Sequence, residues 1–508
     1  MHARPPRTRL FSLATLATLA MVSVTAQAAP RLDRLDGLDR LDILDRLDSL
    51  DRLDILVGGN LGAELGGRPV ALALASDGTV VLASRQRDTS NLLRLDDLGA
   101  AVGPMKQVPE RVEHVAVDPK SGAILVIGDQ SLSAFDRDLA PIWQRRLPAR
   151  DEHEPARRVA VGELGTVAAL AAGDVRVFSP EGLALGDIPA GQSSIRDVAV
   201  LDGEGFVITT GSRSRRACGQ DLDVATLSAF EPGGAPRWDA YGQPGDDQLC
   251  GEHGDLLDST RGVAVARGED GYIYLLAEVE GPRNILRGRP GAPGEPANNV
   301  GFDGMTDAET SQATLFTYFA RFTPNGDHLR GQYLTLPDDG AIVQPAAIAA
   351  DAHGNVHLTG TASHGPAAAD EVPHSEALDA LAGFYTVIEP DFEGRHLWRQ
   401  FEDSAAATAV PALALAKGHA VTLLDVSSPT SGTPGTFPGP MVLQWPADHG
   451  ATAAEKRPER DSLGTFGYES GISGSDSSCY CDADSTPTPM SLLAVAVVGL
   501  ALRRRRGC

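Results

Sequence analysis

Short runs in which apolar and polar residues alternate recur along the chain, and each run is interrupted by a glycine-containing turn. Alternation over four to eight residues is typical of a half-buried β-strand, and a turn between two such strands makes a hairpin. The pattern starts at Pro69, Val112, Arg157, Ile195, Arg261, Pro345 and Pro411, with turn glycines Gly78, Gly122, Gly165, Gly205, Gly271, Gly354 and Gly418. The sequence therefore predicts seven copies of one hairpin.

Each copy is followed by a weaker second hairpin, as in "VRVFSPEGLALG" and "FARFTPNGDHL". Trp143, Trp238 and Trp398 all fall at the far end of such a second half. Two hairpins make a four-stranded antiparallel blade, and seven blades close into a β-propeller. The rival architecture is a row of β-sandwich domains, but the first four turn glycines are 40 to 44 residues apart, and this regularity favours the ring.

The expected fold is therefore all-β, a seven-bladed β-propeller of four-stranded antiparallel blades over residues 55–450. The copies, "DAHGNVHLTG" above all, resemble the loose repeat families of bacterial seven-bladed propellers. The seventh copy lacks a fourth strand, because the chain turns polar after "MVLQWPADHG". The apolar stretch 55–65 is the candidate for that strand, since a strand from the other end of the chain would close the ring and remove two exposed sheet edges.

Extra length enters the repeats on one side only. Turns inside the hairpins lie on one face of a propeller, whereas loops from strand two to strand three and from blade to blade lie on the other. All six insertions belong to the second group, at residues 211–226, 239–260, 281–314, 331–344, 361–383 and 425–440. Variation on one face of a rigid scaffold is typical of a binding surface, although surface drift without a ligand gives the same pattern.

Two cysteines, Cys218 and Cys250, lie in adjacent insertions on this face. In an oxidising compartment we expect a disulfide between them. It would close a loop of about 33 residues, for which the chain-entropy relation gives roughly 3–4 kcal/mol. Free or metal-bound thiols are the alternative, but no histidine with ligand spacing accompanies the pair, which disfavours a metal.

Composition and charge narrow the function. The chain has 508 residues and a formal net charge of −24, and it offers no basic patch for nucleic acid. It contains no Gly-x-Ser-x-Gly, His-Glu-x-x-His or phosphate-binding Gly-Lys-Ser/Thr motif, and we predict no cofactor. Calcium or a sugar is an open alternative to simple solvation for the polar loop residues Ser363, His364, Asp303, Asp307, Asp338 and Asp339.

The N-terminus has the layout of a secretory signal peptide, predicted over residues 1–28. Arginines precede the apolar run 10–24, which is shorter than the roughly 20 residues that span a bilayer, and small residues predict cleavage after Ala28. Residues 29–54 then repeat x-Leu-Asp eight times. Leucines three residues apart form no fixed stripe on an α-helix, so we interpret this segment as a low-complexity spacer, with an adhesive role as the alternative.

The C-terminus combines three elements in a fixed order. Cys479 and Cys481 come first, then the apolar run 490–502, which is short for a permanent span, and then Arg503, Arg504, Arg505 and Arg506. This order resembles the MYXO-CTERM sorting domain of myxobacteria and their relatives. The resemblance covers about 30 residues and implies a dedicated membrane protease as partner, modification at one of the two cysteines and display on the outer envelope. A plain C-terminal anchor is the alternative, and residues 451–478 are expected to form a flexible tether.

Two functions fit these observations. The first is an exported, monomeric propeller at the cell surface or outer membrane of a Gram-negative bacterium, acting as a non-catalytic binding module for a glycan or protein. The second is a propeller-type extracellular lyase or hydrolase acting on polysaccharide or peptide. Such an enzyme would gather acids or histidines where the inner strands start near the central channel, and there the sequence reads Val, Ala and Leu. We therefore favour binding.

Overall fold

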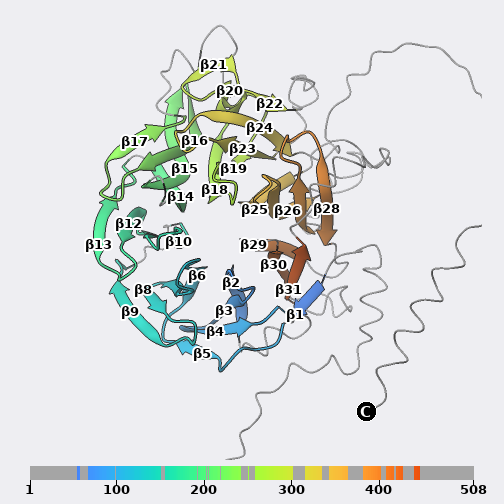
Figure 1. Ribbon diagram of the computed structural model, residues 1–508. Coiled ribbons are helices and arrows are strands. Elements are labelled where there is room, and N and C mark those ends of the chain that lie inside the picture. Colours follow the sequence, from blue (N-terminus) through green and yellow to red (C-terminus); the bar gives the residue numbers. More distant parts are fainter. Residues whose placement is uncertain are drawn as a thin grey trace, which may run out of the picture. The chain divides into compact units, whose positions relative to one another are not determined.

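Seven blades of antiparallel strands surround a central axis; the outermost strand comes later in the chain than the innermost one in six blades and earlier in the seventh (Figure 1). This confirms the predicted seven-bladed β-propeller. The computed structural model describes residues 54–57 and most of 67–446. Within the latter range it leaves out 98, 150–154, 192, 202, 204, 218, 242–249, 251–257, 301–314, 335–341, 364–381, 402–407, 417–418 and 427–439.

Blades 1 to 4 each consist of four strands that pair in the order of the chain. Blade 1 holds β2 (Arg68–Leu74), β3 (Val80–Gln86), β4 (Thr89–Leu95) and β5 (Lys106–Val108). Blade 2 holds β6 (Val112–Val117), β7 (Ile124–Gly128), β8 (Ser131–Phe135) and β9 (Pro141–Arg146). Blade 3 holds β10 (Arg158–Val161), β11 (Val167–Ala171), β12 (Asp174–Phe178) and β13 (Ala184–Ile188). Blade 4 holds β14 (Ser193–Leu201), β15 (Phe206–Ala217), β16 (Gln220–Phe230) and β17 (Pro236–Asp239).

Blades 5 to 7 depart from this scheme in two places. Blade 5 holds β18 (Thr260–Arg267), β19 (Ile273–Val279), β23 (Phe316–Phe322) and β24 (His328–Leu334). Its insertion adds η1 (Ile285–Arg287), β20 (Gly288–Arg289), β21 (Ala292–Pro296) and β22 (Asn299–Val300), which lies parallel to β24. Blade 6 holds β25 (Ile342–Ala350), β26 (Val356–Ser363), β27 (Ala382–Ile388) and β28 (Arg395–Phe401). Blade 7 holds β29 (Thr408–Ala416), β30 (His419–Val426), β31 (Met441–Pro446) and β1 (Asp54–Val57).

Blade 7 takes its fourth strand from the other end of the folded region, as predicted. β1 pairs antiparallel with β31, with Ile55 opposite Leu443. The strand is shorter than the expected 55–65 and starts one residue earlier, at Asp54. Its end at Val57 has a local reason, because two glycines follow in the sequence and glycine is a poor strand former.

The turns inside the hairpins lie on one face of the ring, which we call the hairpin-turn face; the opposite one is the insertion face. Each blade has an inner turn, between its first and second strands, and blades 1 to 6 have an outer turn between their third and fourth strands. Predicted turn glycines have the positive φ that favours this residue, for example +88° at Gly78 and +85° at Gly271. Gly418 lies outside the described residues.

The first insertion, residues 211–226, was expected to be a loop between two strands. The structure shows regular β-structure there instead. Residues 206–217 and 220–230 continue the second and third strands of blade 4 as one long hairpin that extends beyond the neighbouring sheets on the insertion face. Extra length at this point is therefore built as regular structure.

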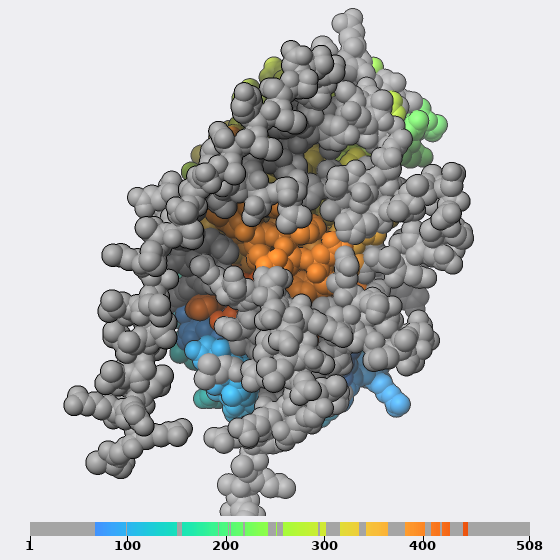
Figure 2. Space-filling model, turned by 90° about the vertical axis from the view of Figure 1, so that its right-hand side faces the viewer, coloured from blue at the N-terminus to red at the C-terminus, as the bar shows by residue number. Residues whose placement is uncertain are grey.

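The hydrophobic core lies between neighbouring blades. Val81 of blade 1 packs with Val115 and Ile124 of blade 2, and Val421 of blade 7 packs with Leu72 of blade 1. Strands with alternate apolar residues form such layers on both sides of a blade, which is why the repeat pattern leads to a ring. Figure 2 views the molecule from the side of blade 6, whose described residues form the orange surface above the blue of blade 1.

Candidate functional site

The predicted site residues fall mostly outside the described part of the chain. Cys250 is described and is disulfide-bonded, but Cys218 is not described, so their pairing stays a prediction. Ser363 ends β26 and is buried, whereas the other polar loop candidates lie outside the described ranges: Asp303, Asp307, Asp338, Asp339 and His364. The same holds for Ala28, Cys479, Cys481, Arg503, Arg504, Arg505 and Arg506.

Two features are absent from the described part of the chain. No described helix is long and apolar enough to cross a membrane. No group of three or more His, Cys, Asp and Glu side chains among the described residues is placed to hold a metal ion. The calcium alternative therefore stays a prediction for the loop residues that the structure does not describe.

The inner strands carry more polar chemistry than the sequence indicated. One inner-strand position, defined by its pairing with the second strand, is Ala71 in blade 1 and Ala264 in blade 5. In blades 2, 3 and 4 the same position holds His114, Arg158 and Asp197. The expectation of only Val, Ala and Leu near the channel was therefore wrong for three consecutive blades.

These three side chains connect neighbouring blades. His114 Nδ1 accepts a long hydrogen bond from the Val159 N–H of blade 3 (3.5 Å), and Asp197 Oδ2 accepts one from the Val265 N–H of blade 5 (2.9 Å). Arg158 Nε lies 4.0 Å from Asp197 Oδ1. Burial, with a smaller contribution from Arg158, lowers the pKa of His114 to about 3, and burial raises the pKa of Asp197. We interpret the row as a structural tie, because its acceptors are engaged with backbone N–H groups of the next blade.

A second polar chain lies inside blade 6. His357 Nδ1 is 2.7 Å from the Tyr385 hydroxyl, and its Nε2 is 3.9 Å from Asp351 Oδ2. Burial acts to raise the pKa of Asp351, but hydrogen bonds from His357 and Asn355 outweigh it and bring this pKa to about 2. Carboxylate, imidazole and hydroxyl in a row suggest catalysis, yet all three residues are at most 3% exposed, so no substrate reaches them. This row of Asp351, His357 and Tyr385 is therefore part of the buried interior of blade 6.

Two hollows lined by described residues lie on the hairpin-turn face, between blades. We call each one an inter-blade slot. One wall comes from the inner turn and the adjoining second and third strands of one blade. The other wall comes from the inner and outer turns of the next blade. Two slots that meet at the inner turn of blade 1 are described by their lining: slot 1/2, between blades 1 and 2, and slot 7/1, between blades 7 and 1.

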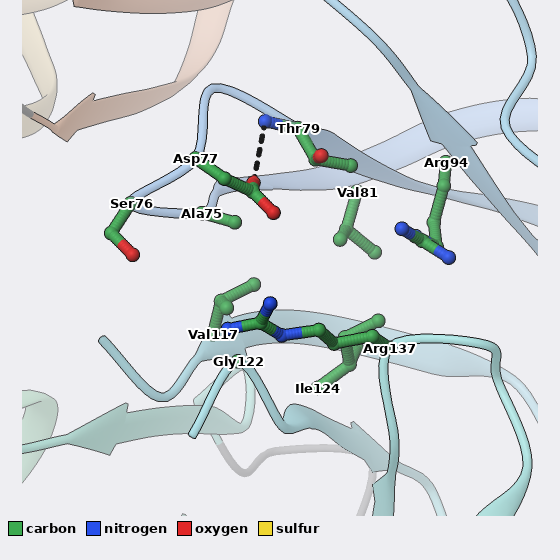
Figure 3. Close-up of a pocket in the computed structure, with 10 residues that line it drawn as sticks. All are labelled: Ala75, Ser76, Asp77, Thr79, Val81, Arg94, Val117, Gly122, Ile124 and Arg137. Atoms are coloured by element: carbon green, nitrogen blue, oxygen red, sulfur yellow. Dashed lines mark hydrogen bonds between the residues drawn. The ribbon is translucent and has the colours of Figure 1, made fainter. Parts of the chain in front are cut away.

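Slot 1/2 is nearly filled by arginine. Its volume is about 10 Å³, enough for one water molecule. The Arg137 side chain lies over Gly122, where a Cβ atom would collide with it, and Arg94 reaches in from β4 (Figure 3). Asp77 accepts a 3.0 Å hydrogen bond from the Thr79 N–H, and this bond, assisted by Arg137, lowers the pKa of Asp77.

Slot 7/1 is open, with a volume of about 190 Å³. Its floor is apolar, formed by Leu74, Ala416 and Val421. Its rim is polar and includes the exposed side chains of Asp77, Asp97 and His419. Gln444 completes the rim, and its Nε2 lies 3.1 Å from His419 Nδ1.

The repeat shows which side chain can fill a slot. Tyr274 in blade 5, Val81 in blade 1 and Val421 in blade 7 are equivalent, since each pairs with the alanine two residues beyond the register shift of its first strand, at Ala266, Ala73 and Ala414. The Tyr274 ring is buried against blade 6 and its hydroxyl donates to Asp270 (2.6 Å). Valine at this position leaves the space that tyrosine fills. An alignment of the repeat copies would show tyrosine at 274 and valine at 81 and 421. A valine in a predicted strand does not by itself indicate a functional site.

The fold defines the protein as a seven-bladed β-propeller. Solved structures that resemble it include two of virginiamycin B lyase from Staphylococcus aureus, a catalytically inactive variant with quinupristin and a selenomethionine-substituted form. Each is 8% identical and covers 78% of this chain and 99% of its own, with TM-scores of 0.43 and 0.42. These values are too low to say anything about activity. No protein-family model matches the chain, and no curated protein does.

Proposed function

We propose that the protein is an exported, surface-displayed β-propeller that acts as a non-catalytic binding module through its insertion face. The observation that carries the proposal is the long hairpin β15–β16, which projects a charged end from that face. The exposed residues near its tip include Arg216, Gln220 and Asp221. A rigid element with an exposed polar end, on the face that collects the insertions, is suited to recognition.

Ion pairs hold the outer half of the hairpin. Arg261 of blade 5 donates to Asp223 of the hairpin (2.9 Å) and to Glu278 and Glu280 of its own blade (3.1 and 2.6 Å). Arg213 lies 3.8 Å from Asp239. These links join the hairpin to two blades, so binding at its tip would cost little ordering entropy.

Binding is preferred to catalysis because of how the inner-strand groups are used. His114 and Asp197 bond to backbone N–H groups of the next blade, and this leaves them unsuited to act as general acid and base. A lyase or hydrolase remains the alternative that the experiment below distinguishes.

The exported protein, screened against a glycan array and envelope proteins with and without calcium, tests this proposal. We expect at least one ligand to be retained, and the double variant Arg216→Ala/Asp221→Ala to weaken retention at least fivefold. Arg146→Ala, an exposed arginine on the rim of blade 2, is the control and should bind like the parent. Retention that the hairpin variant leaves unchanged, or turnover of a polysaccharide or peptide without stable binding, would contradict the proposal.

Export and sorting form part of the same proposal and rest on the order of motifs at the two ends of the chain. Alanine at both Cys479 and Cys481 is expected to leave an unprocessed form in the inner membrane, detected by fractionation and surface labelling. Alanine at Arg503–506 should impair the membrane halt through loss of the positive charges that hold the terminus inside. Normal surface display of both variants would exclude the sorting model.

A further inference from the structure

We infer that the outer circumference of blades 1 to 3 is a docking surface for the chain's own x-Leu-Asp segment, residues 31–53, which directly precedes β1. This surface, which we call the apolar rim, consists of the exposed side chains of Met105, Ile142, Leu183 and Leu185. It is separate from the long hairpin on the insertion face, so the inference does not depend on the proposed function.

Exposed apolar side chains gather in one part of the ring. Six large hydrophobic side chains are exposed among the described residues, and four of them follow the circumference through three consecutive blades. Met105 directly precedes β5 in blade 1 (47% exposed), and Ile142 lies on β9 in blade 2 (55%). Leu183 and Leu185 lie before and on β13 in blade 3 (62% and 47%). Exposed apolar surface that collects in this way is typical of a binding surface.

The apolar rim uses a position that carries other residue types elsewhere. The outermost strand of several blades has a β-bulge after the outer turn, and its extra residue is Ile142 in blade 2 and Leu185 in blade 3. In blades 4 and 6 the extra residue is Arg237 and His396. Arg237 lies over the Phe206 ring of its own blade (3.7 Å to the ring centre), whereas Ile142 and Leu185 are exposed.

The circumference already receives added segments in two other blades. In blade 7 the outermost strand is β1, which pairs with β31. In blade 5, β22 lies beside β24, and Asn298 Nδ2 donates to the Leu329 carbonyl (2.7 Å). Leu329 is the extra residue of the bulge in β24 and is half-buried. No described strand pairs with the outer edge of β9 or β13, so the equivalent edge of blades 2 and 3 is open to a further segment.

The x-Leu-Asp segment joins the described structure close to this surface. It ends at β1, where Asp54 pairs with Gln444 and Val57 with Val442. Gln444 contacts His419 next to the inner turn of blade 7, so the chain before Asp54 enters from the hairpin-turn side. The outer turns that lead into β9 and β13 lie on the same side. Blade 7 adjoins blade 1, where the apolar rim begins (Figure 1).

The length and composition of the segment match the apolar rim. Residues 31–53 span about 75 Å when extended, and neighbouring sheets pack roughly 10 Å apart, so the segment is long enough to pass three blades. Its leucines, three residues apart, align on one side of an extended polyproline-type chain. Its aspartates and arginines find opposite charges on the same strands, at Lys106 and Arg146 and at Asp187.

A tethered segment fits this surface better than a separate protein does. Stable protein interfaces bury about 800 Å² on each partner, whereas four side chains spread over three blades form a narrow surface. A segment joined to the ring through β1 binds at an effective concentration in the millimolar range, for which a narrow surface is sufficient.

Protection from trypsin tests the docking in the intact exported protein, because the segment contains five arginines. We expect cleavage there to be at least fivefold faster in the double variant Ile142→Asp/Leu185→Asp than in the parent. Leu164→Asp, at an exposed leucine in the inner turn of blade 3, is the matched control and should be cleaved like the parent. Equal cleavage rates in the parent and the double variant, with the thermal transition of both intact, would overturn the inference.

A free peptide identifies the occupant. A protein without residues 31–53 keeps every described strand. It should bind a fluorescent peptide of residues 31–42 at least tenfold more tightly than the parent, as measured by anisotropy. A peptide with alanine in place of the leucines should not bind. Binding that survives Ile142→Asp/Leu185→Asp would place the peptide elsewhere and overturn the assignment of the apolar rim. Self-association of the deletion protein without peptide binding, seen by light scattering, would assign the surface to a second copy and overturn the proposed occupant.

Discussion

At the scale of single residues, individual side chains fill or leave open the inter-blade slots, as Arg137 does in slot 1/2 beside the valine at position 81. Tyrosine at position 274 fills the slot between blades 5 and 6, and valine at position 421 leaves slot 7/1 open. The sequence predicted the strands that carry both residues, because alternation fixes the side that each residue faces. It did not predict the slot, since the shape depends on turns from a neighbouring blade that no local pattern reveals.

His114 makes the stability of the protein sensitive to mild acid. Its pKa is about 3 in the folded state against the ordinary 6.5, so as pH falls below 6.5 the unfolded chain takes up a proton first and stability is lost. We expect the free energy of unfolding to fall by about 3 kcal/mol between pH 6.5 and 4 through this group. Urea unfolding of His114→Gln should show a correspondingly smaller loss over this range; an unchanged slope would contradict the interpretation.

Asp351 acts in a lower pH range. Its pKa of about 2 lies below the ordinary 3.8, so the stability that it contributes is present above pH 4 and is lost as pH falls toward 2. The loss should amount to about 2 kcal/mol. Asp351→Asn should be less stable at pH 7 and lose less between pH 4 and 2, as measured by calorimetry. Equal losses in the parent and the variant would show that the hydrogen bonds from Asn355 and His357 do not depend on charge.

At the scale of elements, the repeat determined which strands exist and the neighbouring strands determined where they end. The closing strand was predicted from an incomplete seventh copy, yet its bounds of Asp54–Val57 follow from the edge of β31 and the glycines after it. Residues 211–226 of the long hairpin β15–β16 were predicted only as an insertion, because the serines and arginines at 212–216 do not alternate with apolar residues.

The closing strand can be tested by removing one donor. Ile55→Pro takes away a backbone N–H opposite Leu443 and should destabilise the ring by about 1–3 kcal/mol, the cost of leaving a ladder partner unpaired. Thermal unfolding of Ile55→Pro and of the conservative Ile55→Val would be compared. A large loss in proline alone is expected, whereas similar transitions in both would mean that blade 7 closes without this pairing.

At the scale of the whole molecule, regular spacing was enough to predict seven blades, because only a closed ring buries both sides of every repeat. The insertion face was correctly expected to receive the extra length. The two inter-blade slots lined by described residues nevertheless lie on the opposite face, where short turns from adjacent blades meet. Loop lengths can be compared along the sequence, and they predict where insertions lie. The slots depend instead on the sizes of side chains that meet between two blades.

A disulfide between Cys218 and Cys250 would act at this scale as well, because it would join the connection before β16 to the connection after β17. If Cys218 pairs with Cys250, the double variant Cys218→Ser/Cys250→Ser should lose roughly 3–4 kcal/mol of unfolding free energy. The same loss should follow when the parent is reduced, and reduction should not affect the double variant further. Alkylation of both Cys218 and Cys250 in the unreduced protein, located by mass spectrometry of their peptides, would disprove the pairing.

Pairing of β1 with β31 joins residues almost four hundred positions apart. During synthesis, β1 is made before the other described strands, but it can pair only after β31 has been made. The ring therefore closes last at blade 7. A fragment that stops short of Met441 has no edge on which Asp54–Val57 can settle. In a truncated product β1 would lack its partner strand, and the unclosed ring would be open to proteolysis. We therefore expect only chains synthesised through blade 7 to accumulate as folded protein.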